Sequence, residues 1–190
     1  AIKNIFDEAK LIDDFAIIAP VNTDPNHPNY KSSNKTFKQN IIEADSVDGF
    51  AMLINKKKFD ENNFFDENFF LFLENDDLCK RTKILGNNIY VIKNAFIEHK
   101  GFSSSTKINK DELEYLRNWH WMWSKFYFNK KYHGFFQAFI FILPSFFSSI
   151  LKILLFTLLL NSKKRKIYQF RFSGILNSII GKTSWYRIKD

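Results

Sequence analysis

Acidic side chains gather in one aromatic segment of the sequence. Residues 64–81 read FFDENFFLFLENDDLCKR and carry five carboxylates among phenylalanines: Asp66, Glu67, Glu74, Asp76 and Asp77. Further along, the strand-like run IYVIKNAFIEH ends in His99, just before a loop rich in Gly and Ser. Carboxylates and an imidazole at the ends of strands and helices are the components of an acid/base or metal site.

Each of these residues also has a structural interpretation. Asp76 and Asp77 stand where a helix begins, so they fit helix-capping acids as well as a general base. A lone histidine at a strand end, such as His99, is more often structural than catalytic. Asp48 next to Gly49 fits either a ligand contact or a plain turn, and His27 in a polar loop fits a solvated side chain.

The elements around these residues follow from periodicity. We expect a short helix within 1–12, a buried strand over 15–20 that stops at Pro20, and a polar loop over 21–40. A second strand over 44–55 is broken at Gly49, which indicates a bulge or a close backbone approach. A helix over 75–86 ends at Gly86, with Leu78, Thr82 and Leu85 facing inward, and a strand precedes His99.

The last third of the chain has a different character. Residues 109–128 predict an aromatic helix capped by Asn109, which fits either a core helix or a membrane-interface helix. Residues 135–160 are long and apolar enough to span a bilayer. Because both flanks are basic, we expect a helix pair bent at Pro144 and lying in one leaflet rather than a span. Another amphipathic helix follows.

Composition narrows the classes of function. The formal net charge is +8, and the basic residues dominate the tail, which favours an anionic membrane surface. The acidic cluster and the lack of a basic-aromatic motif argue against nucleic acid as a partner. The single cysteine, Cys79, excludes an intrachain disulfide and a zinc site made of cysteines.

Several of these motifs occur in an order that resembles the C-terminal half of family 2 glycosyltransferases, especially the rhamnosyltransferase-like enzymes of bacterial polysaccharide assembly. The resemblance covers about residues 10–130 and rests on these residues: Val47, Gly49, 65–70, Glu74, Asp77, Leu78, Cys79, Arg81, Ala95, His99, Gly101, Ser103, and Arg117 with Asn118 and Trp119.

The resemblance implies an α/β fold: part of a GT-A sheet, which is Rossmann-like, with helices over 1–130. The apolar and basic sequence of residues 131–190 predicts a helical membrane-associated tail after it. It implies an inverting transfer from a nucleotide-sugar donor to a glycan or lipid-linked acceptor. Glu74 is the expected base, with Asp76 and Asp77 as alternatives. The expected substrate contacts are Asp48, Gly49, Arg81 and Arg117. His99 is expected to reach a divalent cation, Mg²⁺ or Mn²⁺, or the diphosphate.

Two departures from the family pattern matter. The residue after Glu74 is Asn75, where the family carries the aspartate that usually acts as base. No donor-binding half with its Asp-x-Asp motif precedes Ala1, so we expect this chain to be the acceptor half of a longer enzyme, with an exposed sheet edge and little activity alone. The expected location is the cytoplasmic face of the inner or cell membrane. The alternative is a non-catalytic membrane-binding or scaffold module derived from such an enzyme.

Overall fold

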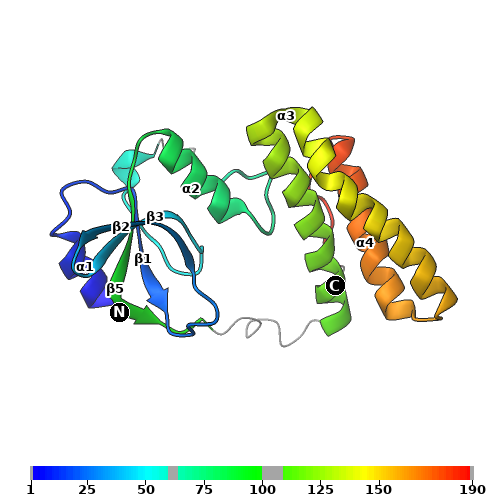
Figure 1. The fold of residues 1–190 in the computed structure, drawn as a ribbon, viewed down its shortest axis with the longest axis horizontal. Helices are drawn as coiled ribbons and strands as arrows, with labels where there is room; N and C mark the ends of the chain where they lie inside the picture. The colour runs from blue at the N-terminus through cyan, green and yellow to red at the C-terminus, as the bar shows by residue number, and fades with distance from the viewer. Residues whose placement is uncertain (1, 60–63, 100–108, 189–190) are drawn as a thin grey trace. The chain divides into compact units, whose positions relative to one another are not determined.

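The computed structural model describes residues 2–59, 64–99 and 109–188, with the backbone alone at 33–36. The chain forms two compact units (Figure 1). Unit 1 contains residues 1–66 and 74–103, and unit 2 contains residues 67–73 and 104–190. The predicted domain boundary at residue 130 stays a prediction. The two compact units meet instead between residues 103 and 104.

Unit 1 is built on a five-stranded mixed sheet in the order β2-β3-β5-β1-β4. The strands are β1 (Ile17–Asn22), β2 (Tyr30–Lys38), β3 (Ile41–Val47), β4 (Leu53–Ile54) and β5 (Ile89–Ile97). β1 and β5 are parallel, and the other three pairs are antiparallel. The expected α/β class is therefore confirmed, while the GT-A arrangement stays a prediction.

The central strands are buried on both faces, which explains their nearly continuous apolar sequences. On one face, Leu78 and Cys79 of α2 (Glu74–Ile84) pack against Ile17, Ala19 and neighbouring strand residues. On the other face, Ile5 of α1 (Ile2–Ala9) packs with the strand residues whose side chains point to that side of the sheet: Ile18, Ile41, Tyr90, Ile92 and Ala95. Successive strand residues thus serve two separate cores.

Some local predictions for unit 1 are wrong. The polar stretch 21–40 contains β2, which pairs with β3 along a sheet edge where polar side chains are tolerated. The strand predicted over 44–55 is two strands, β3 and β4, with Gly49 in the turn between them. Leu85 is 68% exposed, because α2 ends at Ile84 and Gly86 adopts a φ of 74°. A short 3₁₀ turn, η1 (Lys56–Lys58), follows β4.

Unit 2 is a helical bundle. α3 (Lys110–Leu158) is interrupted at Gly134, whose φ of 81° and ψ of 167° are not helical. We call 110–133 the first arm and 135–158 the second arm. α4 (Ser162–Ile179) packs on both arms. Trp119 Nε1 of the first arm donates to Ser173 Oγ of α4, and Phe146 of the second arm contacts Phe172 of α4.

The predicted bend at Pro144 is wrong, because Pro144 lies inside the second arm and the departure from helical geometry falls at Gly134. Glycine adopts the left-handed φ of this position without the steric cost that a Cβ would add. The predicted cap is confirmed, since Asn109 Oδ1 accepts from the Asp111 amide. Trp119 and Trp123 are core residues, whereas Trp121 is 40% exposed.

The contact between α3 and α4 depends on Gly174. A Cβ built at this position would lie 2.3 Å from the Trp119 carbonyl oxygen, which is backbone and cannot rotate away. We expect Gly174→Ala to lower the free energy of unfolding of unit 2 by at least about 1–3 kcal/mol through overpacking. Chemical denaturation followed by tryptophan fluorescence measures this change. Gln169→Ala, at an exposed position of the same helix, should leave stability within about 0.5 kcal/mol.

His120 makes the stability of unit 2 depend on pH. Its side chain is fully buried, Nε2 lies 2.8 Å from the Tyr186 carbonyl oxygen, and Nδ1 has no partner among the described residues. Burial lowers the pKa of His120 to about 4, against the opposing effect of the Tyr186 hydrogen bond. The unfolded chain therefore binds a proton that the folded chain excludes between about pH 6.5 and 4.

Stability should accordingly fall as the pH is lowered from 6.5 towards 4, by at most about 1.4 kcal/mol per pH unit from this group. Melting temperatures of His120→Gln and of the exposed control His133→Gln, compared with the parent chain across this range, test the assignment. The His120 variant should lose part of the pH dependence and the control should keep it. Equal slopes in all three proteins would contradict the role of His120.

Candidate functional site

The turn after β3 brings together motif residues that are far apart in the sequence. The Asp48 amide donates to the Asn29 carbonyl at 2.8 Å, and the Asn75 amide group donates to the Val47 carbonyl at 3.2 Å. A Cβ at Gly49 would lie 3.4 Å from Asn75 Cβ, so the backbone of the turn approaches the start of α2 closely. Gly49 therefore lies in a turn that contacts Asn75 at van der Waals distance.

His99 joins the same turn from the end of β5. Its ring stacks on the Phe50 ring, with centroids 4.6 Å apart and 12° between the planes. Its backbone amide lies 3.5 Å from Asn22 Oδ1 at the end of β1. The imidazole itself is exposed. Because one ring face is covered by Phe50 while the ring stays in contact with solvent, His99 is both oriented and accessible.

The charges around the turn act on one another. Loss of part of its hydration raises the pKa of Asp48, and the negative charge of Asp76 raises it further, while His99 and Lys31 oppose the shift. Lys31 Nζ lies 3.8 Å from Asp76 Oδ1. Two carboxylates, one imidazole and one ammonium therefore share this region, which we call the turn cluster: Lys31, Asp48, Asp76 and His99.

Glu74 is the first residue of α2, one residue before the Asn75 contact. Its Oε2 atom is buried and has no hydrogen-bond partner among the described residues. The two residues before it, Phe72 and Leu73, have φ values of 70° and 66°. Non-glycine residues in this region are strained, and such strain is common beside functional sites. A buried carboxylate oxygen without a protein partner can accept a hydrogen bond from a bound hydroxyl.

Asp77 and Arg81 form a pair within α2. Asp77 is fully buried, and Arg81 Nε donates to Asp77 Oδ2 at 2.8 Å. Arg81 also donates to the Phe64 carbonyl at 2.6 Å. This geometry favours the structural interpretation of Asp77 and gives Arg81 the task of holding residue 64. Their catalytic and substrate-binding roles stay predictions.

Other predicted residues are less informative. Arg117 lies on the first arm of α3 in unit 2, with its guanidinium 5.7 Å from the centroid of the Phe72 ring. Ala95 is buried in β5. Gly101 and Ser103 lie outside the described residues. His27 is exposed in the loop before β2 and pairs with Asp24 at 2.7 Å, as expected for a solvated histidine.

The expected divalent cation stays a prediction. Within the described ranges, no three His, Cys, Asp or Glu side chains are grouped so that they could hold a metal ion. His99 and the carboxylates of the turn cluster have suitable donor atoms. Any metal at this place would therefore need further ligands, such as diphosphate oxygens.

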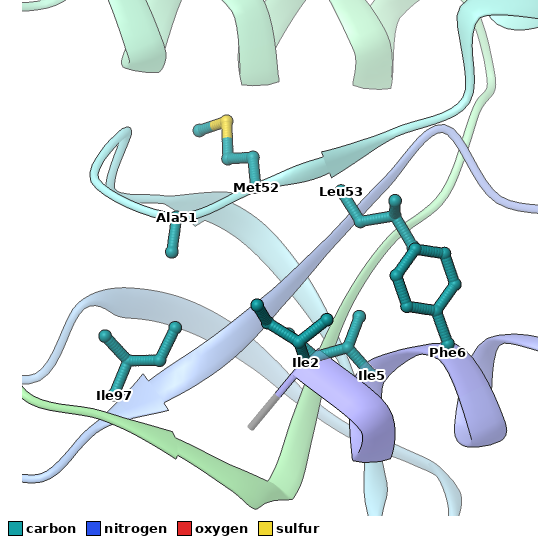
Figure 2. Close-up of a pocket in the computed structure, with 7 residues that line it drawn as sticks. All are labelled: Ile2, Ile5, Phe6, Ala51, Met52, Leu53 and Ile97. Atoms are coloured by element: carbon teal, nitrogen blue, oxygen red, sulfur yellow. The ribbon is translucent and has the colours of Figure 1, made fainter.

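Two hollows elsewhere have a different character. In unit 1 an apolar pocket of about 280 Å³ lies between α1 and the chain leading into β4 (Figure 2). Its lining residues are Ile2, Ile5, Phe6, Ala51, Met52, Leu53 and Ile97. In unit 2 a more polar pocket of about 440 Å³ lies beside the start of α3. Neither is lined by residues of the turn cluster.

Sequence reasoning missed Lys31 and Phe50. Lys31 lies on β2, within the stretch predicted to be a loop, and Phe50 is one of 23 phenylalanines. The sequence feature that could have identified Phe50 is its position immediately after Asp48 and Gly49.

Comparisons of the chain with protein-family models, with curated proteins and with solved structures found no match. The family resemblance therefore rests on the motifs alone.

Because Asp77 is buried in an ion pair with Arg81, we expect substitution of Asp77 to lower the stability of unit 1. Removing one partner of a buried pair typically costs about 3–5 kcal/mol. We expect Asp77→Asn to approach this cost, since the buried carboxylate of the ion pair with Arg81 is replaced by a neutral amide. Denaturation of unit 1 measures the change, with Asp45→Asn on the exposed side of β3 as the control. Unchanged stability in Asp77→Asn would remove the structural role.

Proposed function

We propose that this chain is the acceptor-binding and base-supplying part of an inverting glycosyltransferase. It would transfer a sugar from a nucleotide-sugar to a glycan or lipid-linked acceptor in cell-surface polysaccharide assembly. The observation that carries the proposal is the turn cluster: Asp48, Asp76 and His99, which are far apart in the sequence, lie close enough to act on one another, with Lys31 beside them. The order of the motifs along the sequence does not by itself require these side chains to lie close together in the fold.

In this proposal Glu74 is the general base. Its Oε2, which has no hydrogen-bond partner among the described residues, accepts the proton of the acceptor hydroxyl as that oxygen attacks the anomeric carbon of the donor sugar. The bond between that carbon and the diphosphate breaks, and the nucleoside diphosphate leaves with the bonding electrons. Asp76, half-buried and paired loosely with Lys31, is the alternative base.

His99 would hold the departing diphosphate or contact its metal ion. The accessible, Phe50-stacked imidazole fits one ligand position or one hydrogen-bond donor. A divalent cation, when bound, would neutralise the negative charge that develops on the diphosphate. Lys31 contributes positive charge to the same region.

Asn75 has a different task from the aspartate that it replaces. An amide cannot accept a proton as a base, and here its nitrogen donates to Val47 O, which fixes the turn. The substitution supports the second candidate function, a non-catalytic membrane-binding or scaffold module. Donor binding separates the two candidates, because a scaffold needs no nucleotide-sugar.

The resemblance also implies a donor-binding half. Among the described residues, β4 pairs only with β1 and leaves its other edge open. The apolar pocket in Figure 2 includes Leu53 of β4, and its lining residues Ile2 and Phe6 are 69% and 52% exposed. We assign the open edge and the pocket to contact with the donor-binding half, since both would otherwise expose unpaired backbone and apolar surface to water.

The proposed place of action is the cytoplasmic face of the membrane. α3 contains an apolar window long enough to cross a bilayer by length and composition, and most of that window is exposed. Such a surface would hold the enzyme close to a lipid-linked acceptor.

Glu74→Gln tests the base in the protein encoded by the complete reading frame. We expect turnover to fall by about 10²–10⁴-fold while donor binding persists, because the amide cannot take the proton. Transfer is measured with a radiolabelled nucleotide-sugar, and donor affinity by calorimetry with and without Mg²⁺. Glu67→Gln, which alters a neighbouring acid of the same segment, is the matched control.

Two further variants sharpen the result. A loss in Asp76→Asn with normal turnover in Glu74→Gln would move the base to Asp76. His99→Ala should reduce turnover and weaken binding of the donor in Mg²⁺ without unfolding the protein. If the complete protein binds no nucleotide-sugar, the scaffold candidate replaces the enzyme.

A further inference from the structure

The second arm of α3 presents one continuous apolar face. Six large side chains at helical spacing are between 47% and 81% exposed, and we call them the outer stripe: Phe136, Ile140, Phe147, Leu151, Leu154 and Leu158. The opposite side of the same arm is covered, since Ala138 and Ile142 are buried against Ile175 of α4. The stripe therefore belongs to a helix whose inner side is already packed.

The single charged residue of the second arm does not interrupt the stripe. Lys152 Nζ lies 4.8 Å from the centroid of the Tyr168 ring on α4, so its ammonium is directed towards the neighbouring helix. The outer stripe thus runs the length of an arm of 24 residues, ~36 Å at 1.5 Å per residue.

The partners of the second arm carry charge at the level of its middle. Phe172 of α4 touches Phe146, and the adjacent Arg171 donates to Asn118 of the first arm at 3.0 Å. Nearer the start of α4, Lys163 pairs with Asp111 at 2.7 Å. If the second arm crossed a bilayer, α4 beside it would take Arg171 into hydrocarbon, which is strongly unfavourable.

The charges at the two ends of the arm fit a different placement. Exposed Lys130 and Lys131 precede Gly134, and exposed Lys163, Lys164 and Lys166 follow the other end. From Tyr115 to Ile188 the sequence contains twelve Lys and Arg and no Asp or Glu. Both ends would lie in the headgroup layer of one anionic surface if the arm lay along it.

We propose that unit 2 binds an anionic bilayer side-on: the second arm lies parallel to the membrane plane, the outer stripe enters one leaflet, and both basic ends remain on the same side. This inference deepens the membrane part of the proposed function and rests on it, but it does not depend on glycosyl transfer. The occupant of the stripe is lipid, because the surrounding charge is complementary to anionic headgroups and the stripe itself is apolar.

Sidedness is the first test. Single cysteines at His133→Cys and Ser162→Cys flank the second arm in the full chain, with the buried Cys79 replaced by Ala. The protein is bound to sealed vesicles of phosphatidylcholine and phosphatidylglycerol, and a membrane-impermeant maleimide is added outside. We expect both cysteines to be labelled. Labelling of only one, with the other reacting after detergent is added, would show a span and overturn the side-on placement.

Depth is the second test. Environment-sensitive fluorophores at Phe136→Cys, Phe147→Cys and Leu158→Cys are quenched by lipids labelled at known depths. Side-on binding predicts similar, shallow depths for all three positions. If the fluorophore at position 147 lay deep in the bilayer while those at 136 and 158 lay near the headgroups, the side-on placement would be wrong.

Matched substitutions test the stripe itself. Leu151→Glu with Leu154→Glu should weaken vesicle binding at least about 10-fold, because two charges enter the leaflet. Leu85→Glu, at a leucine of similar exposure in unit 1 (68% against 66% for Leu151), should bind as the parent chain does. Binding should also fall without phosphatidylglycerol or at high salt.

The outcomes separate the two proposals. If the parent chain fails to bind these vesicles, both the membrane location and the side-on placement fail, whatever the transfer assay shows. If it binds but Leu151→Glu with Leu154→Glu binds equally well, the stripe is not the membrane contact. If labelling and depth support the placement while donor binding is absent, the side-on inference stands and the enzyme proposal fails.

Discussion

The contact between the turn at 48–50 and the first residues of α2 is the constraint on which the candidate site depends. The Asn75–Val47 hydrogen bond ties the helix start to the turn, where Gly49 faces the Asn75 side chain. This approach places Asp76 near Asp48, and the stack of His99 on Phe50 adds the imidazole.

The same arrangement explains why an amide at position 75 is compatible with an organised site. Its side chain is used as a donor to the backbone, a task that an ionised carboxylate cannot perform. The neighbouring carboxylates have different surroundings. Asp77 is buried against Arg81, Asp76 is half-buried near Lys31, and one oxygen of Glu74 has no partner within the described part of the chain. One helical turn thus offers three acids suited to three different tasks.

Unit 2 follows a separate physical logic. Segment 67–73 packs its aromatic residues against the first arm, as in the contacts of Phe69 with Tyr127 and of Phe72 with Trp121. The chain then passes through the left-handed residues Phe72 and Leu73 into α2 of unit 1. The aromatic and acidic halves of one sequence motif therefore belong to different compact units, and a substitution in the aromatic half can influence the proposed base through the backbone.

Much of this was determined by the sequence itself. Apolar periodicity and capping residues were sufficient to predict α1, α2, β1, β5 and the start of α3 at Asn109, because these depend on local spacing and on the dihedral freedom of residues such as Gly86. The motif order was sufficient to select Asp48, Gly49, Asp76 and His99 as candidates, although not to assign their roles.

Only the tertiary structure decided the rest. β2 has a polar sequence without a local strand signal, and it exists because β3 offers backbone partners to its edge. The chain departs from helical geometry at Gly134 rather than at Pro144, since a proline can be accommodated within a helix whereas the backbone at 134 requires a positive φ. The contacts of Phe50 and Lys31 with the site, and the position of charged α4 beside an apolar arm, depend on packing between distant segments, which no local pattern encodes.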